Sequence, residues 1–375
     1  MKEKIMNKNS LKPAEIKYIL EEKHRTANRQ FQGVPGIEVA SGGRIWATWY
    51  SGGIAEGPQN FSILVTSNDD GETWSEKPVA VIDPIGNVRS FDPVLWHDPL
   101  GRLWWFWSQS YSPADGEVFD GTGGVWATFT EDSNTEQPVF SEPRRIADGV
   151  MMNKPTVLSD GTWLLPTAVW ECFGPKLPEM AKNRFSNITV SCDNGHSFSL
   201  RGSADVPERS FDEHMIIELK DGRLWMLVRT MYGIGQSFSG DKGIAWTPGE
   251  NSGLSGPNSR FFIRRLSSGR LLLVNNANPD SAGKMKRSHL YAFLSDDDGK
   301  TWQGGLLLDE RDNVSYPDGA EDSRGVIRII YDRERHKHGE ILAAAFKEED
   351  VLAGKCITPQ ARLRTLVNRT EGIKV

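Results

Sequence analysis

Two acids, two bases and a phenol occupy equivalent positions of a repeated pattern in this chain. Asp92, Glu213, Arg260 and Tyr316 each lie nine residues before a glycine, and Lys154 takes the matching position where the intervening segment is two residues shorter. If the repeats surround an axis, these side chains converge, and titratable groups that converge in a concavity are the usual signature of a site. The alternative is that they are ordinary solvated residues at the mouth of a channel.

The repeat that sets this register consists of a glycine, a basic or polar residue and then apolar residues, as in Gly101-Arg-Leu-Trp. Each copy lies between two apolar runs, a pattern that predicts a strand, a tight glycine turn and a second strand. The six copies begin at Gly43, Gly101, Gly161, Gly222, Gly269 and Gly325. Regular repetition over most of a long chain predicts one repeat architecture rather than two separate domains.

A second motif follows four of the copies. It is Ser67-Asn-Asp-Asp-Gly-Glu-Thr-Trp74 and Ser295-Asp-Asp-Asp-Gly-Lys-Thr-Trp302, with looser copies at 191–198 and 239–246. We expect the aspartate to accept bonds from backbone N–H groups, the glycine to take a positive φ and the aromatic residue to pack under the turn.

This motif resembles the Asp-box of the sialidase (neuraminidase) superfamily, and the chain is similar to bacterial BNR-repeat sialidase-like proteins over roughly residues 31 to 350. The resemblance implies an all-β, six-bladed β-propeller. The blades are expected at approximately 31–82, 90–147, 151–206, 210–256, 258–311 and 314–352. Asp-boxes lie away from the active site and occur in other propellers, so they specify the fold and not the reaction.

We expect a propeller over residues 31–352, an N-terminal extension over 1–30 and a C-terminal tail over 353–375 that packs on the propeller. The last blade has only about three strands in this assignment. Residues 16–21 have two interpretations, an outer strand that closes the last blade or a short helix.

The resemblance also implies roles for matching residues. Tyr316 resembles the tyrosine nucleophile of sialidases and Glu213 the glutamate that activates it, while Arg229 and Arg287 resemble the second and third arginines that bind the sialic acid carboxylate. A neutral phenol suits an anomeric carbon that bears a carboxylate, since an anionic nucleophile would be repelled. The alternatives are a buried ion pair for Arg229 and a core phenol for Tyr316.

The sequence departs from the family pattern at two places. Gly33, in Gln32-Gly-Val-Pro35, stands where the first arginine is expected, and the usual aspartate acid is replaced by Glu56, with Asp92 as a second candidate acid. Because a lost charge-assisted contact removes about 1.5–3 kcal/mol, we expect common α-sialosides to be poor substrates. The further residues expected in a remodelled pocket are Gln32, Trp49, Arg89, His97, Lys154, Arg209, Asp212, His214 and Arg260, with Tyr50, Trp107 and Trp170 as candidates for stacking on a sugar.

Composition excludes several classes of partner. The net charge is −6 with no block of Lys and Arg, which argues against nucleic-acid binding. No apolar run reaches membrane-spanning length, and residues 1–8 lack the apolar core of a signal peptide. We therefore expect a cytoplasmic protein whose three cysteines are reduced, with a periplasmic or secreted protein as the alternative if a signal peptide has been removed. No cofactor or metal motif is present, and the sequence carries no signal for an oligomeric state.

Three functions remain open. The leading one is a retaining exo-glycosidase that acts on a terminal acidic sugar of an oligosaccharide or glycoside, with Tyr316, Glu213 and either Glu56 or Asp92 as catalytic residues. The second is a lyase or a neutral-sugar glycosidase on the same propeller, favoured by the missing first arginine. The third is a glycan-binding propeller without catalysis, which does not need an activated phenol.

Overall fold

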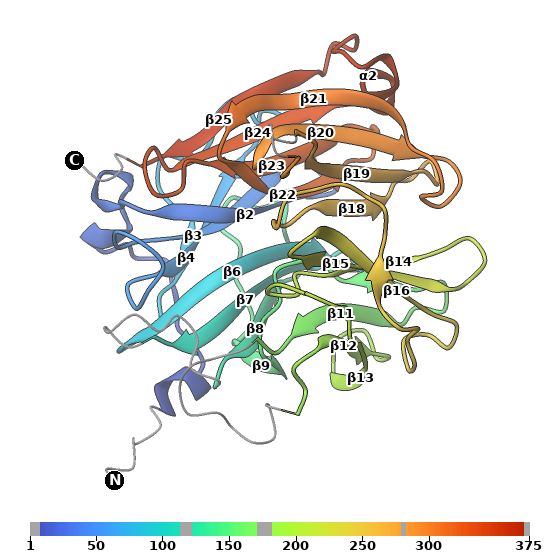
Figure 1. The fold of residues 1–375 in the computed structure, drawn as a ribbon. Helices are drawn as coiled ribbons and strands as arrows, with labels where there is room; N and C mark the ends of the chain where they lie inside the picture. Colours follow the sequence, from blue (N-terminus) through green and yellow to red (C-terminus); the bar gives the residue numbers. More distant parts are fainter. Residues whose placement is uncertain (1–7, 113–121, 171–181, 279–282, 371–375) are drawn as a thin grey trace.

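The computed structural model describes residues 8–112, 122–170, 182–278 and 283–370, which form six antiparallel sheets (Figure 1). Each sheet contacts the next one along the chain, and the innermost strand of the last sheet contacts that of the first, so the sheets close a ring. This arrangement confirms the predicted six-bladed β-propeller. None of the helices among the described residues is long and apolar enough to span a membrane.

Each blade is built from strands that are consecutive in the sequence. The innermost strands are β2 (Gln32–Val39), β6 (Val88–His97), β10 (Thr156–Val157), β14 (Met215–Glu218), β18 (Phe262–Arg265) and β22 (Val314–Glu321). The second strands are β3 (Ile45–Ser51), β7 (Leu103–Tyr111), β11 (Trp163–Ala168), β15 (Leu224–Thr230), β19 (Leu271–Asn276) and β23 (Ile327–Arg333). The third strands are β4 (Phe61–Ser67), β8 (Gly124–Thr130), β12 (Ser186–Ser191), β16 (Gly233–Ser239), β20 (Ser288–Ser295) and β24 (Glu340–Phe346). The fourth strands are β5 (Ala80–Ile82), β9 (Arg144–Asp148), β13 (Ser199–Ala204), β17 (Glu250–Asn251), β21 (Gln303–Asp312) and β25 (Arg362–Arg369).

The six repeat glycines close equivalent turns between the first and second strands. Their φ angles lie between 71° at Gly325 and 92° at Gly43, a region that favours glycine. The amide of each donates to the carbonyl three residues earlier, as in Gly222 to Leu219 at 2.9 Å. In the described part of the chain no atom beyond the adjacent residues lies within 4 Å of where a Cβ at these positions would be, so backbone conformation and not lack of space explains the glycines.

The Asp-boxes connect third to fourth strands as expected. In the copy after β20, Asp297 accepts bonds from the Thr301 amide at 2.8 Å and from the Thr301 and Ser295 hydroxyls at 2.7 and 2.9 Å. The backbone bond and these hydroxyls lower the pKa of Asp297 to about 2. Each box therefore stabilises a surface turn.

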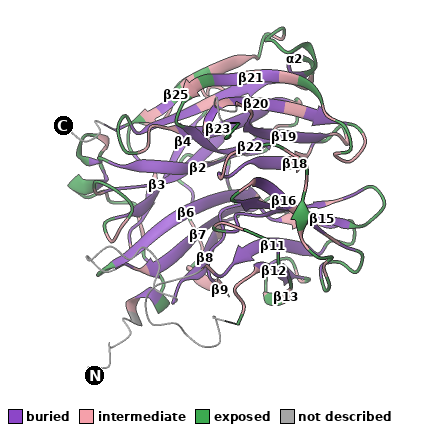
Figure 2. Ribbon diagram, viewed as in Figure 1, coloured by how far each residue is buried: buried purple, intermediate pink, exposed green. Residues whose placement is uncertain are grey.

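Burial follows position in the blade (Figure 2). The second strands are almost entirely buried, whereas the fourth strands β13 and β17 are largely exposed. Aromatic side chains fill the space between blades, as where the Trp163 ring meets Trp96 edge-on at 4.8 Å. This rigid packing positions the ends of the innermost strands.

The chain ends differ from the sequence prediction. The segment β1 (Ile16–Lys17) pairs with β5 and covers the first blade, so the expectation that residues 16–21 close the last blade, or form a helix, is wrong. The missing outer strand is β25, from the segment expected to be a tail. A short helix, α2 (Glu348–Ala353), ends at Gly354 with φ 64° and reverses the chain, which lets β25 pair with β24.

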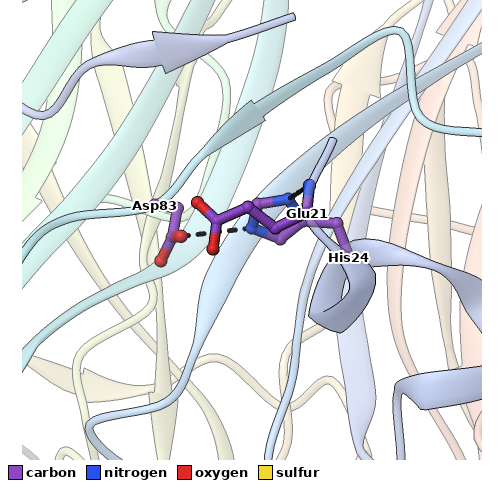
Figure 3. Close-up of side chains that lie close together, drawn as sticks. All are labelled: Glu21, His24 and Asp83. Atoms are coloured by element: carbon purple, nitrogen blue, oxygen red, sulfur yellow. Dashed lines mark hydrogen bonds and ion pairs between the residues drawn. The ribbon is translucent and has the colours of Figure 1, made fainter. Parts of the chain in front are cut away.

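Three short 3-10 helices, η1 (Lys8–Leu11), η2 (Glu22–His24) and η3 (Thr26–Asn28), complete the N-terminal extension. Glu21, His24 and Asp83 come together where it joins blade one (Figure 3). The Glu21 amide donates to His24 Nδ1, so Nε2 carries the proton and donates to Asp83 at 3.1 Å. Lys17 and Lys23 also pair with Asp83, at 3.0 and 2.6 Å. Because His24 Nδ1 already accepts a hydrogen bond and two lysines already pair with Asp83, this group is an ion-pair cluster and not a metal site.

Candidate active site

The innermost strands of three blades are bulged at a dipeptide that ends in proline. The register shifts fall between Gly33 and Gly36 in β2, between Phe91 and Val94 in β6 and between Ser315 and Asp318 in β22. At each bulge the residue before proline has a positive φ: 55° at Val34, 49° at Asp92 and 56° at Tyr316. Glu213, at the same register just before β14, has φ 41°. Bulges redirect side chains, and such strained conformations concentrate at functional sites.

These four side chains face a cavity of about 250 Å³ to which all six blades contribute. Nine of the predicted residues line it, namely Glu56, Arg89, Asp92, Glu213, Arg229, Arg287 and Tyr316 and the stacking candidates Tyr50 and Trp170. Its other lining residues are Val34, Phe91, Met152, Phe211 and Arg335. The register therefore identified residues that converge at one end of the axis.

Three arginines surround Tyr316. Arg229 Nη1 donates to the phenol oxygen at 3.1 Å and also to Glu213. The guanidinium carbons of Arg287 and Arg335 lie 5.2 and 4.6 Å from the centre of the phenol ring. Among the described residues no hydrogen bond joins Glu213 to Tyr316, because Arg229 bonds to both, and Glu213 Oε2 is buried without a partner.

The two candidate acids lie in different environments. Burial raises the pKa of Asp92 to about 8, since the nearby Arg89 charge only partly opposes it, and Asp92 Oδ2 has no hydrogen-bond partner among the described residues. Partial burial of Glu56 is outweighed by Arg89 and Arg335, whose charges lower its pKa. The Glu56 carboxylate lies 3.9 Å from Arg89 and 3.4 Å from Arg335. At neutral pH Asp92 is therefore protonated and Glu56 is ionised.

Aromatic side chains support the arginines. The Arg89 guanidinium lies 4.1 Å from the centre of Phe91, and that of Arg229 lies 5.0 Å from Phe211. Trp170 meets Phe211 edge-on at 5.3 Å. Of the four stacking candidates, Tyr50 and Trp170 line the cavity, whereas Trp49 and Trp107 are fully buried in the core. Packing of this kind holds guanidinium groups in fixed directions.

Lys154 and Arg260 lie on the axis but do not line the cavity, which corrects their prediction as substrate-binding residues. Lys154 Nζ donates to the Ile37 and Leu95 carbonyls, both at 2.6 Å, and pairs with Glu38 and Asp318 at 2.8 and 3.3 Å. Arg260 pairs with the same Asp318 at 3.2 Å. Their long side chains are used to hold neighbouring innermost strands together.

Five other predicted residues also have structural contacts outside the cavity. Trp49 donates to Gln32, which donates to the Gly339 carbonyl at 2.6 Å, so both belong to the core around blades one and six. Asp212 pairs with Arg209 at 3.1 Å and accepts from the Ser186 hydroxyl. His214 is buried against the Asn187 carbonyl, and desolvation lowers its pKa to about 4. None of these side chains lines the cavity, although each lies within two residues of one that does.

A second cavity, of about 350 Å³, lies at the opposite ends of the innermost strands, lined by His97, Lys154, Glu218 and Arg264 among others. His97 is bonded to Glu38 at 3.2 Å and to the Ser133 hydroxyl at 2.9 Å. The predicted pocket residue His97 thus lies far along β6 from Asp92.

Sequence reasoning missed Arg335. It follows β23 in a run of charged residues, Asp332-Arg-Glu-Arg-His-Lys-His338, which is typical of a solvated turn. Its side chain is instead 13% exposed and lines the cavity. The only signal that pointed to it was Gly33 itself, at a position where an arginine was expected.

Residues 43–329 match the family model described as the BNR repeat-like domain. A sialidase of Paraclostridium sordellii is 23% identical over 245 residues, which cover 60% of this chain and 58% of that protein. The chain therefore spans less than two thirds of that relative's length.

Two solved structures share the fold. The Hadza microbial sialidase Hz136 has a TM-score of 0.66 at 17% identity, covering 87% of this chain and 67% of that one. The intramolecular trans-sialidase of Ruminococcus gnavus, in complex with oseltamivir carboxylate, has a TM-score of 0.67 at 14% identity, covering 92% and 98%.

Proposed function

The chain belongs to the BNR repeat-like domain family, within the sialidase-like superfamily, and on that premise we propose that it is a retaining exo-glycosidase that removes a terminal acidic sugar. The observation that carries the proposal is the charge of the cavity. Among the described residues four arginines line it, two carboxylates pair with them, and Asp92 holds its proton, so positive charge is in excess by two in this part of the chain. An anionic ligand such as a sugar carboxylate compensates this excess, and arginine forks match a carboxylate geometrically.

The size of the cavity supports action at a chain end. At about 250 Å³ it lies below the usual range of ligand pockets, about 300–1,000 Å³. Such a space suits one sugar ring and its carboxylate rather than several rings of a polymer.

In the proposed mechanism Tyr316 attacks the anomeric carbon while the bond from that carbon to the leaving oxygen breaks. The phenol proton passes to Glu213, whose Oε2 makes no hydrogen bond with the described residues. Arg229 stabilises the developing phenolate, since its Nη1 already donates to Tyr316. Water then releases the sugar from tyrosine, and Glu213 returns the proton to the phenol.

Asp92 is the proposed proton donor to the leaving oxygen. It carries a proton at neutral pH and faces the cavity, whereas Glu56 is held ionised between two arginines. After the first step the Asp92 carboxylate takes a proton from the attacking water, as microscopic reversibility requires. Glu56 then serves to orient Arg89 and Arg335.

The test is a panel of fluorogenic glycosides that carry acidic or neutral terminal sugars. We expect turnover of an acidic glycoside, with proton NMR showing that the first anomer released has the configuration of the substrate. Turnover confined to neutral sugars, release of the inverted anomer, or an unsaturated product that absorbs in the near ultraviolet would each contradict the proposal.

A further inference from the structure

Gly33 occupies a position in β2 that does not need a glycine for backbone reasons. Its φ lies outside the left-handed region in which glycine is favoured. A Cβ at Gly33 would instead lie 2.2 Å from Cδ and 2.7 Å from Cγ of Arg335, closer than any real contact. The missing side chain thus leaves the space through which the Arg335 side chain passes.

Arg335 reaches this space from another blade. It lies between β23 and β24 of blade six, whereas Gly33 lies on the innermost strand of blade one. The bulge at Val34-Pro35 is held by Asp332, whose Oδ2 accepts from the Val34 amide at 2.8 Å and whose Oδ1 accepts from the Ser315 hydroxyl. Asp332 therefore positions β2 against the segment that carries Arg335.

The Arg335 guanidinium is only loosely bound by protein groups. Its nearest contacts with acids in the described chain are 3.4 Å to Glu56 and 3.8 Å to Asp332, both longer than a good charge-assisted hydrogen bond. A guanidinium has five N–H donors, so most of this fork is available to a ligand. It faces the same phenol ring as Arg287, and Arg229 bonds to the hydroxyl of that ring.

Resting on the proposed function, we infer that Arg335, supplied from blade six, joins Arg229 and Arg287 as a carboxylate-binding arginine in place of the missing first one, and that Gly33 leaves the space it requires. The three guanidinium groups then come from blades four, five and six and converge on the phenol that faces the anomeric carbon. The expectation that α-sialosides are poor substrates depended on an empty first position. With Arg335 in that position, the reason for the expectation disappears.

The test compares an acid with its ester in calorimetric binding. Oseltamivir carboxylate is the acid, and oseltamivir, its ethyl ester, has no negative charge to bind. We expect the wild type to prefer the acid, and Arg335→Ala to weaken acid binding about 10- to 100-fold while ester binding changes less than about threefold. Arg335→Lys should recover part of the lost affinity for the acid. Arg333 pairs with Glu340 outside the cavity, so the control variant Arg333→Ala should bind both ligands as the wild type does.

A reciprocal exchange tests the role of Gly33. Gly33→Ala should lower the melting temperature in the wild type, because its Cβ would lie 2.2 Å from Arg335 Cδ. The loss should be smaller in an Arg335→Gly background, where only the 2.9 Å approach to Asp332 Oδ2 remains. The double variant Gly33→Arg, Arg335→Gly should regain a preference for the acid that Arg335→Gly alone lacks. A wild type without preference for the acid would refute the proposed function and this inference together. A wild-type preference that survives in Arg335→Ala would refute only the inference.

Discussion

Replacing Tyr316 by phenylalanine separates chemistry from packing at this site. The phenyl ring keeps its contacts with Arg287 and Arg335, and only the hydroxyl that accepts from Arg229 at 3.1 Å is lost. One hydrogen bond to a charged group contributes about 1.5–3 kcal/mol, so the unfolding free energy should fall by no more than that. Without a nucleophile, kcat should fall by at least about 10³-fold.

The assay is kcat on the best substrate from the glycoside panel, with urea unfolding of the same preparations. Tyr331→Phe is the matched control, because Tyr331 is also buried in blade six and also loses one hydrogen bond, to Asp309 at 3.1 Å, but lies outside the cavity. We expect Tyr331→Phe to lose similar stability and to keep wild-type kcat. If Tyr316→Phe keeps more than about a tenth of wild-type activity, the tyrosine mechanism is incorrect.

The same geometry predicts the outcome of four further measurements, on Glu213, Asp92 and Lys154. Glu213→Gln should lower kcat about 10²- to 10⁴-fold, the usual size of a general-base contribution, whereas Glu208→Gln, outside the cavity, should match the wild type. Because Asp92 must be protonated to act as the acid and its pKa is raised to about 8, activity should decline about tenfold per pH unit above pH 8, and a rate that is flat to pH 10 would exclude this role. Between about pH 4 and pH 8 the folded protein keeps the proton on Asp92 whereas the unfolded chain has lost it, so the unfolding free energy should fall as pH rises through this range. Asp92→Asn should remove this pH dependence in urea unfolding. Lys154→Met should lower the unfolding free energy by about 3–5 kcal/mol, because it breaks a buried ion pair, and should leave KM within about twofold of the wild-type value. A large rise in KM with unchanged stability would instead show that Lys154 binds substrate.

The architecture was determined by local sequence signals. Each turn glycine and each Asp-box acts within a few residues, through a positive φ or through bonds to nearby amides, so the printed sequence contains all that is needed to recognise them. Their spacing then specifies the blade register, and the register identified Asp92, Glu213 and Tyr316 as neighbours at one end of the axis. The dipeptides that end in proline at residues 35, 93 and 317 were a further signal of the bulges that aim these side chains.

Only the tertiary structure decided where long side chains go from equivalent backbone positions. Lys154 and Arg260 share the register of Glu213, yet they extend along the axis to carbonyls and an aspartate of other blades. The same holds at the chain ends, where the strand that completes the last blade is selected by pairing with β24 and not by its own sequence. Arg335 enters the site only because closing the ring brings blade six against Gly33. Gly33 and Arg335 are far apart in the sequence and meet only in the closed ring, so no local sequence pattern shows that the Arg335 side chain fills the space beside Gly33.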